Sequence, residues 1–386
     1  MKWSSEARRS TFIRCFERDS ELALFGCESE LEVSESGYLR RYRKWRQIIV
    51  ALLALLVVVT VLSLNVGFAQ IPISNIVRIL IHEVPFVGNS LGGSGFSDSE
   101  RLIITQIRLP RIFAGILVGV SLAASGAVFQ GIFRNPMADP YVLGVSSGAA
   151  LGAALAIVLR VGFTLFGIDT LSIMAFIGAV AATFTVYNIA RVGSRTPVVT
   201  LLLSGVAVSI FLSAIVAILQ VIAGWELHKL VFWLMGGFSY VKWKDVWGIL
   251  PLTCLSVSLS YLFARDLNIM ALGEEEAQHL GVNVERSRWI LLALGSLATA
   301  TAVSISGLVG FVGLIVPHLT RILVGPDHRI LIPASLLTGA VFLISCDAIA
   351  RVIFAPSELP VGIITALSGG PFFIYLLRKK KGNYLL

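Results

Sequence analysis

The stretch IIVALLALLVVVTVLSLNVGFA, residues 48–69, decides the fold class of this chain. It contains no charged residue, and a helix needs only about 20 apolar residues to cross the hydrocarbon core of a bilayer. The stretch is also longer than the apolar region of a cleavable signal peptide, and a polar segment precedes it. We therefore expect a transmembrane helix at this position.

The rest of the chain has the same apolar character. Of its 386 residues, 56% are hydrophobic and only 14% are charged, whereas soluble domains contain about 25% charged residues. The composition predicts an all-α polytopic membrane protein. The net charge of +8 is therefore no sign of nucleic-acid binding.

Apolar runs of suitable length recur along the whole chain. We expect about ten transmembrane helices, at 47–67, 111–133, 142–163, 171–191, 198–222, 246–264, 288–306, 308–324, 330–350 and 360–378. With both termini inside, the inner segments hold 22 of the 31 Lys and Arg residues and the outer segments hold nine. The positive-inside rule thus favours a multi-pass cell-membrane protein with both termini in the cytoplasm.

These boundaries divide the chain into three parts. Residues 1–45 form a polar cytoplasmic tail, residues 46–380 the transmembrane domain, and residues 381–386 a short cytoplasmic tail. We expect residues 1–39 to be a flexible tail, with a short amphipathic helix on the membrane surface at 12–26 as the alternative. Glycines spaced GxxxG, at 115 and 119 and at 144, 148 and 152, predict close helix packing, with the lining of a substrate path as the alternative.

Residues for catalysis or metal binding are not evident. GxxxxGK[ST] and HExxH do not occur, so we expect no nucleotide site, no catalytic residue and no cofactor. The isolated His279 and His318 do not predict a metal site. Asp347 is the main ionisable residue within a span, and Arg351 lies on the same helix face four residues later. We expect the two to form an ion pair.

An acidic segment, ALGEEEAQHLGV at 271–282, separates two long apolar runs. It is too polar to be part of a core, and a helix of about ten residues is marginal alone in water. Either water solvates this segment or another protein covers it, and the residues alone leave both alternatives open.

Several long motifs make the chain resemble the FecCD family of ABC-importer permeases. These are QIRLPRIFAGILVGVSLAASGAVFQGIFRNPMADPYVLGVSSGAALGAALAI at 106–157, WLMGGFSYVKW at 233–243, MALGEEEAQHLGV at 270–282, SGLVGFVGLIVPHLTR with GPDHR at 306–329, and DAIARVIFAPSELPVGIITALSGGPFFIYLL at 347–377. The resemblance covers about residues 45–380. It implies the type II ABC importer fold, with ten helices in each subunit.

The same resemblance implies partners. It implies a homodimer with the path on its axis, two ABC ATPase subunits on the cytoplasmic side and a soluble substrate-binding protein on the outer side. ATP would bind the partner ATPase, so this chain is expected to be no enzyme. The cytoplasmic loop at 265–287 would couple to the ATPase through Leu272, Gly273, Glu274, Glu275, Ala277, Leu280 and Gly281.

Two further groups of residues match functional positions of the family. Arg108 and Arg351 match arginines that receive acidic residues of the binding protein. Asn135 and Met137, together with Val198 and Val199, match two turns that form the cytoplasmic gate. At the last two positions the cobalamin permease of the family has hydroxyl residues, so this gate would be apolar.

The expected function is inward transport of a metal chelate by alternating access, driven by ATP hydrolysis in the partner. Iron-siderophore, haem and cobalamin stay open as cargo. An ion-coupled secondary transporter that uses Asp347, with Glu226 as the other available carboxylate, is the alternative. A receptor-like membrane protein that transports nothing is a weaker one, because the chain has no large soluble segment.

Overall fold

The computed structural model describes residues 22–67, 69–83, 95–165, 168–193 and 196–381. Contacts between residues divide the chain into two units, residues 1–51 and 52–386. The first unit contains the beginning of helix α2 (Leu22–Asn65). Because α2 begins at Leu22, residues 22–39 are helical rather than part of a flexible tail, which corrects our expectation there. The first 21 residues lie outside the described part of the chain.

Helices make up almost all of the second unit. After α2 come α3 (Ile73–His82), α4 (Asp98–Leu102), η2 (Ile103–Arg108), α5 (Leu109–Ile132), η3 (Pro140–Leu143), α6 (Val145–Val158), α7 (Thr170–Ala190), α8 (Val198–Ile222), η4 (Gly224–Glu226), α9 (Leu227–Met235), α10 (Trp243–Leu262), α11 (Ala264–Met270), α12 (Glu274–His279), α13 (Val284–Ser306), α14 (Val312–Val324), α15 (His328–Val352) and α16 (Val361–Lys381). A two-residue antiparallel ribbon, β1 (Thr164–Leu165) with β2 (Ile168–Asp169), joins α6 to α7.

Each predicted span contains a helix. In the described part of the chain, seven helices are long and apolar enough to cross a membrane, and α6, α14 and α16 are shorter apolar helices. The fold is therefore the predicted all-α polytopic one, and the count of ten spans is approximate. Helices α2 and α13 begin earlier than predicted, at Leu22 and Val284, whereas α6 and α14 are shorter than predicted because their flanking residues lie in turns and loops.

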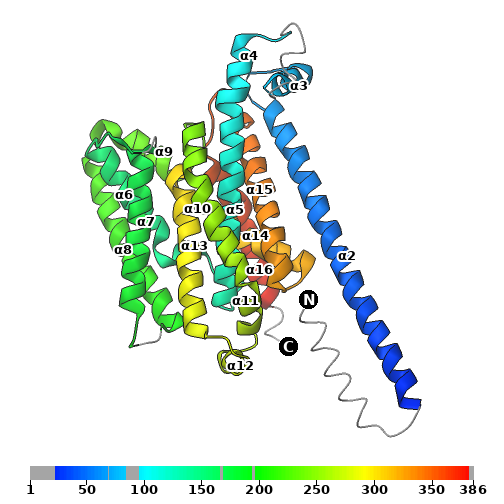
Figure 1. The fold of residues 1–386 in the computed structure, drawn as a ribbon. Coiled ribbons are helices and arrows are strands. Elements are labelled where there is room, and N and C mark those ends of the chain that lie inside the picture. Colours follow the sequence, from blue (N-terminus) through cyan, green and yellow to red (C-terminus); the bar gives the residue numbers. More distant parts are fainter. Residues whose placement is uncertain (1–21, 68, 84–94, 166–167, 194–195, 382–386) are drawn as a thin grey trace. The chain divides into compact units, whose positions relative to one another are not determined.

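Helix α5 lies at the centre of the second unit and packs against α10, α13, α14 and α15 (Figure 1). Helices α6, α7 and α8, drawn in green in Figure 1, pack against one another. Small residues permit these close crossings. A Cβ at Gly119 would lie 2.4 Å from the carbonyl oxygen of Gly339, and one at Gly148 would lie 2.3 Å from that of Gly178. Helix packing is thus the role of these two glycines.

Helix α10 buries polar side chains and exposes apolar ones, as is typical of a membrane protein. Its buried face contains Thr253, Ser256 and Ser260, while leucines on the opposite face are exposed. The hydroxyl groups of Thr253 and of Ser121 on α5 lie 3.2 Å apart and share a hydrogen bond. Apolar exposure costs nothing in lipid, whereas each buried polar group needs a partner.

A π-helical turn, η2, precedes α5 and has a local cause. Pro110 lacks an N–H group and its ring would clash with the carbonyl group four residues earlier. The helix widens here, so that the N–H of Leu109 donates to the carbonyl oxygen of Ile104. The carbonyl oxygen of Thr105 accepts a hydrogen bond from the Trp243 indole at 2.7 Å. The turn places Arg108 and Arg111 at the start of α5.

Candidate functional site

The acidic segment forms a short helix, α12, between two glycine turns. Gly273 precedes it with φ 153° and Gly281 follows it with φ 82°, a backbone conformation that favours glycine. Three glutamates occupy the first turn of α12, where the helix dipole favours negative charge. The sequence therefore fixes both ends of α12.

The apolar residues of the segment 271–282 lie in two different environments. Ala277 is fully buried and packs with Met270, Val282 and Val284. In contrast, Leu272 is 67% exposed and Leu280 is 57% exposed. Ala277 thus attaches α12 to its own chain, and the two leucines are left available to another surface.

Glu274 differs from the next two glutamates because it bonds within the chain. Its carboxylate pairs with Arg288 of α13 at 2.5 Å and lies 3.8 Å from a guanidinium nitrogen of Arg134. Arg288 also pairs with Glu285 at 3.0 Å. We call Arg134, Glu274, Glu285 and Arg288 the α12 cluster. Glu275 and Glu276 are exposed.

Arg288 is the centre of the α12 cluster. Its side chain is 4% exposed, whereas that of Glu274 is 47% exposed. Its guanidinium group also reaches the carbonyl oxygen of Thr196 at 3.5 Å, directly before Pro197 and the start of α8. One buried arginine therefore links α12 to the turn that leads into α8.

The predicted gate residues lie on two turns near α12. In the first, the side-chain oxygen of Asn135 accepts a hydrogen bond from the N–H of Met137 at 2.9 Å. In the second, Val198 begins α8 and Val199 is exposed. A hollow of about 550 Å³ is lined by Val198, by residues 132–134 and by residues 272–276. Of the four gate residues, Val198 lines the same hollow as the α12 segment.

Asp139 lies at the end of the turn that contains Asn135 and Met137. Its carboxylate accepts a hydrogen bond from the N–H of Tyr141 at 2.8 Å and so caps η3. Burial raises the pKa of Asp139 to about 6, and the hydrogen bond from Tyr141 offsets part of this rise.

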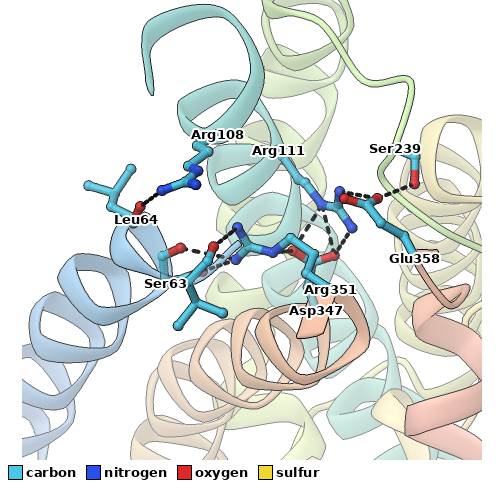
Figure 2. A network of polar contacts seen from close by, with 9 residues as sticks. Ser63, Leu64, Arg108, Arg111, Ser239, Asp347, Arg351 and Glu358 are labelled. Carbon is cyan, nitrogen blue, oxygen red and sulfur yellow. Dashed lines mark hydrogen bonds and ion pairs between the residues drawn. The ribbon is translucent and has the colours of Figure 1, made fainter. Parts of the chain in front are cut away.

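A second set of charges lies around the start of α5, and Figure 2 shows its contacts. Asp347 of α15 accepts hydrogen bonds from the Arg111 guanidinium at 2.9 and 3.0 Å and pairs with Arg351 at 3.2 Å. The ion pair predicted between Asp347 and Arg351 is confirmed. We call Arg108, Arg111, Asp347, Arg351 and Glu358 the α5–α15 cluster.

Arg108 and Arg351 are both buried and bond to the end of α2 (Figure 2). Arg108 donates to the carbonyl oxygens of Leu64, at 2.5 Å, and Ala69. Arg351 donates to the carbonyl oxygens of Val66 at 2.9 Å and Ser63 at 3.1 Å, and to the Ser63 hydroxyl. The last carbonyl groups of a helix lack partners within it, so the two arginines cap α2. Neither guanidinium group extends freely into solvent, as a simple docking arginine would.

Glu358 is the most exposed member of the α5–α15 cluster. It accepts hydrogen bonds from Arg111 at 2.7 Å and from Ser239 at 3.0 Å, with 40% of its side chain exposed. Burial alone would raise the pKa of Glu358, but the charge and hydrogen bond of Arg111 outweigh it and lower that pKa. Three arginines and two carboxylates leave the cluster with a net positive charge if all are ionised.

Two central residues were missed by the sequence analysis. Arg111 stands three residues after Arg108, so helical spacing places both on one face and gave a usable signal. Arg288 follows Glu285 by three residues, which predicts that pair but not its contact with Glu274. No group of histidine, cysteine, aspartate and glutamate residues in the described ranges has the geometry of a metal site.

The family model and the curated proteins that are similar to this chain all belong to transport systems. Residues 55–379 match the model of the FecCD transport family. The cobalamin import system permease protein BtuC of Halobacterium salinarum is 47% identical over 81% of this chain and 86% of its own length. The hemin transport system permease protein HmuU of Yersinia pestis is 37% identical over 76% and 88%.

A relative named for a different substrate and a solved structure are also similar to this chain. The molybdate import system permease protein MolB of Haemophilus influenzae is 38% identical over 87% of this chain and 96% of its own length. A solved inward-facing structure of an ABC transporter superposes with a TM-score of 0.74 at 35% identity, covering 86% of this chain and 99% of that chain.

Proposed function

Because this chain belongs to the FecCD transport family, we propose that it is the membrane-spanning permease subunit of an ATP-driven importer of a metal chelate. It would act as a homodimer, with two ABC ATPase subunits on the cytoplasmic side and a soluble binding protein on the outer side. Both termini would lie in the cytoplasm, as the distribution of basic residues favours.

The arrangement around α12 supports this proposal most strongly. Leu272 and Leu280 are exposed on either side of α12, and Glu275 and Glu276 are exposed within it. A six-residue helix flanked by two exposed leucines fits a surface that a partner covers better than one that water solvates. The ATPase would therefore dock on Leu272, Leu280, Glu275 and Glu276.

The contacts of Arg288 suggest how a movement of the ATPase reaches the gate. A displacement of α12 would move Glu274, and the bond at 2.5 Å would transmit this movement to Arg288. Arg288 contacts the carbonyl oxygen of Thr196, two residues before Val198. The turns at Asn135–Met137 and Val198–Val199 would then open or close in alternating access. An apolar constriction at the valines can close by dewetting.

On the outer side, the binding protein would dock over the α5–α15 cluster. Arg108 and Arg351 would attract its acidic residues through the net positive charge of the cluster, while their guanidinium groups stay bonded to α2. Charge complementarity of this kind contributes orientation and association rate more than affinity.

The cargo is proposed as a metal chelate, with cobalamin, haem and iron-siderophore as the candidates. Relatives named for cobalamin and hemin transport support this class, and one named for molybdate transport shows that related chains also serve oxyanions. Selection among these would belong to the binding protein.

The contacts of Asp347 argue against the secondary-transporter alternative. A proton or ion carrier must release its charge partners during the cycle, but Asp347 is bonded by two arginines that are themselves buried. Losing either would leave a buried charge unpaired.

Isolation of the transporter from its own host tests the proposal. The chain carries a C-terminal tag, is extracted in mild detergent, and its companions are identified by mass spectrometry. We expect an ABC ATPase at one copy per permease, and Leu272→Asp should reduce its yield. Recovery of the permease alone in several detergents would contradict the proposal.

A further inference from the structure

A second hollow, of about 370 Å³, lies where α10 ends and α13 begins. Its lining includes Phe263, Arg265 and Asp266 after α10, Val282 before α13, and Arg286 and Ile290 on α13. We call it the α10–α13 hollow. Since α10 ends at Leu262 and α13 begins at Val284, the hollow lies at the level where two spans leave the hydrocarbon, which is the level of lipid headgroups.

Two arginines in this hollow have no protein partner. Within the described residues, neither the guanidinium group of Arg265 nor that of Arg286 takes part in a hydrogen bond or an ion pair, and both residues are exposed. The main-chain N–H of Arg286 donates to the Asn283 side chain at 3.0 Å. Asp266 also lines the hollow, but among the described residues its carboxylate is paired with neither arginine and accepts a hydrogen bond from Ser287 at 2.9 Å. The hollow therefore presents two free guanidinium groups, the side chains best suited to bind phosphate oxygens in pairs.

An exposed apolar surface leads to the hollow from the membrane side. Leu255, Leu259 and Leu262 lie on one face of α10 and are exposed, and Phe263 of the hollow follows directly. Trp289, between Arg286 and Ile290 in the sequence, is also exposed, and tryptophan is typical of the membrane–water interface. Acyl chains on the leucines would thus place a headgroup beside the arginines.

We propose that the α10–α13 hollow binds the headgroup phosphate of an anionic phospholipid such as phosphatidylglycerol. The inference rests on the membrane location of the family and does not depend on the cargo. Leu280 and Gly281 of the α12 segment also line the hollow, so the proposed ATPase is the competing occupant. The lipid is favoured because the exposed leucines of α10 end directly before Phe263, which lines the hollow.

The test uses the full chain in phosphatidylcholine vesicles that contain a fixed fraction of brominated phosphatidylglycerol or brominated phosphatidylcholine. Bromine quenches nearby tryptophan, and the difference from Trp289→Phe isolates the contribution of Trp289. We expect stronger quenching by the anionic lipid. In the double variant Arg265→Gln/Arg286→Gln this preference should fall by up to about 25-fold, from a loss of roughly fivefold for each basic residue.

Matched variants separate a site from general charge. Arg191→Gln/Arg378→Gln removes the same charge elsewhere and should keep the preference, as should Arg265→Lys/Arg286→Lys. Equal quenching by the two lipids in the wild type, or an unchanged preference in the glutamine double variant, would overturn the proposal. Loss of the preference in millimolar inorganic phosphate would also overturn it, by indicating a site for a free anion. If the glutamine double variant lost ATPase co-purification but kept its lipid preference, the two arginines would belong to the ATPase interface instead.

Discussion

The α5–α15 cluster and the α12 cluster both contain buried arginines, but only the first also contains a buried carboxylate. Asp347 of the first cluster is 3% exposed. Glu274 and Glu285 of the second are 47% and 35% exposed. In the first cluster, main-chain carbonyl oxygens of the α2 end provide further acceptors. The first cluster is therefore closed to water on most sides, and the second opens on solvent and on a hollow.

This difference indicates different tasks. Removing one partner of a buried ion pair costs about 3–5 kcal/mol, because the other charge stays buried. A solvent-exposed pair contributes only about 0–1 kcal/mol and exchanges readily. We infer that the α5–α15 cluster holds α2, α5 and α15 together, while the α12 cluster can rearrange when α12 moves.

The largest expected effect is that of Asp347→Asn. The change leaves Arg111 and Arg351 without their shared carboxylate, so we expect about 3–5 kcal/mol of destabilisation. Thermal unfolding in detergent, followed by size-exclusion chromatography, measures it. A stable variant that lost transport in a pH-dependent way would instead support the secondary-transporter alternative.

Arg288→Gln should separate coupling from stability. Glu274 and Glu285 can turn to water once Arg288 is removed, so we expect a fold close to that of the wild type. ATP-driven uptake should fall by about 5- to 150-fold, the range of typical coupling energies. Uptake into proteoliposomes measures it, with Arg378→Gln as the control, an exposed arginine outside both clusters. If Arg288→Gln destabilised the protein as much as Asp347→Asn, the two clusters would have the same structural role.

Glu274 and Glu275 should differ although they are neighbours. Glu274→Gln weakens the bond to Arg288 within the chain, so uptake should fall while the ATPase still binds. Glu275→Gln should weaken ATPase binding by about two- to fivefold, the contribution of one exposed charge. Pull-down titration and uptake assays on both variants resolve the two effects. Identical behaviour would show that both glutamates face the partner.

The smallest expected effect is the pH dependence of Glu358. Its pKa is lowered in the folded protein, so its contribution to stability is present above the ordinary pKa of 4.5 and is lost as pH falls through the lowered value. Unfolding curves between about pH 3 and pH 6 should show this loss, and Glu358→Gln should reduce it. A variant with the wild-type pH profile would assign the loss to another group.

Features set by local sequence could be predicted. Hydropathy located the spans, glycines at 273 and 281 located the ends of α12, and helical spacing identified the pair Asp347–Arg351. The positions of close helix crossings were harder to predict. Gly119 lies directly against Gly339, whereas Gly115 makes only an ordinary van der Waals contact with Ile344. Which glycine of a motif lies at the crossing depends on the angle between helices.

Contacts between distant segments could not be predicted. Arg111 and Asp347 are 236 residues apart, and no local pattern shows that α5 and α15 are neighbours. The same is true of the link from Arg288 to Thr196, 92 residues earlier. The burial of Arg108 and Arg351 was equally hidden, since an arginine at a helix end has the same sequence signal whether it faces solvent or caps another helix.

We infer that α12 acts on the gate through the bond between Glu274 and Arg288. A double-mutant cycle of Glu274→Gln and Arg288→Gln tests it most directly, with ATP-driven uptake measured in proteoliposomes that contain the partner ATPase and the binding protein. We predict that the double variant is no worse than Arg288→Gln alone, with an interaction energy of at least about 1 kcal/mol. Effects that add within about 0.5 kcal/mol would contradict the account.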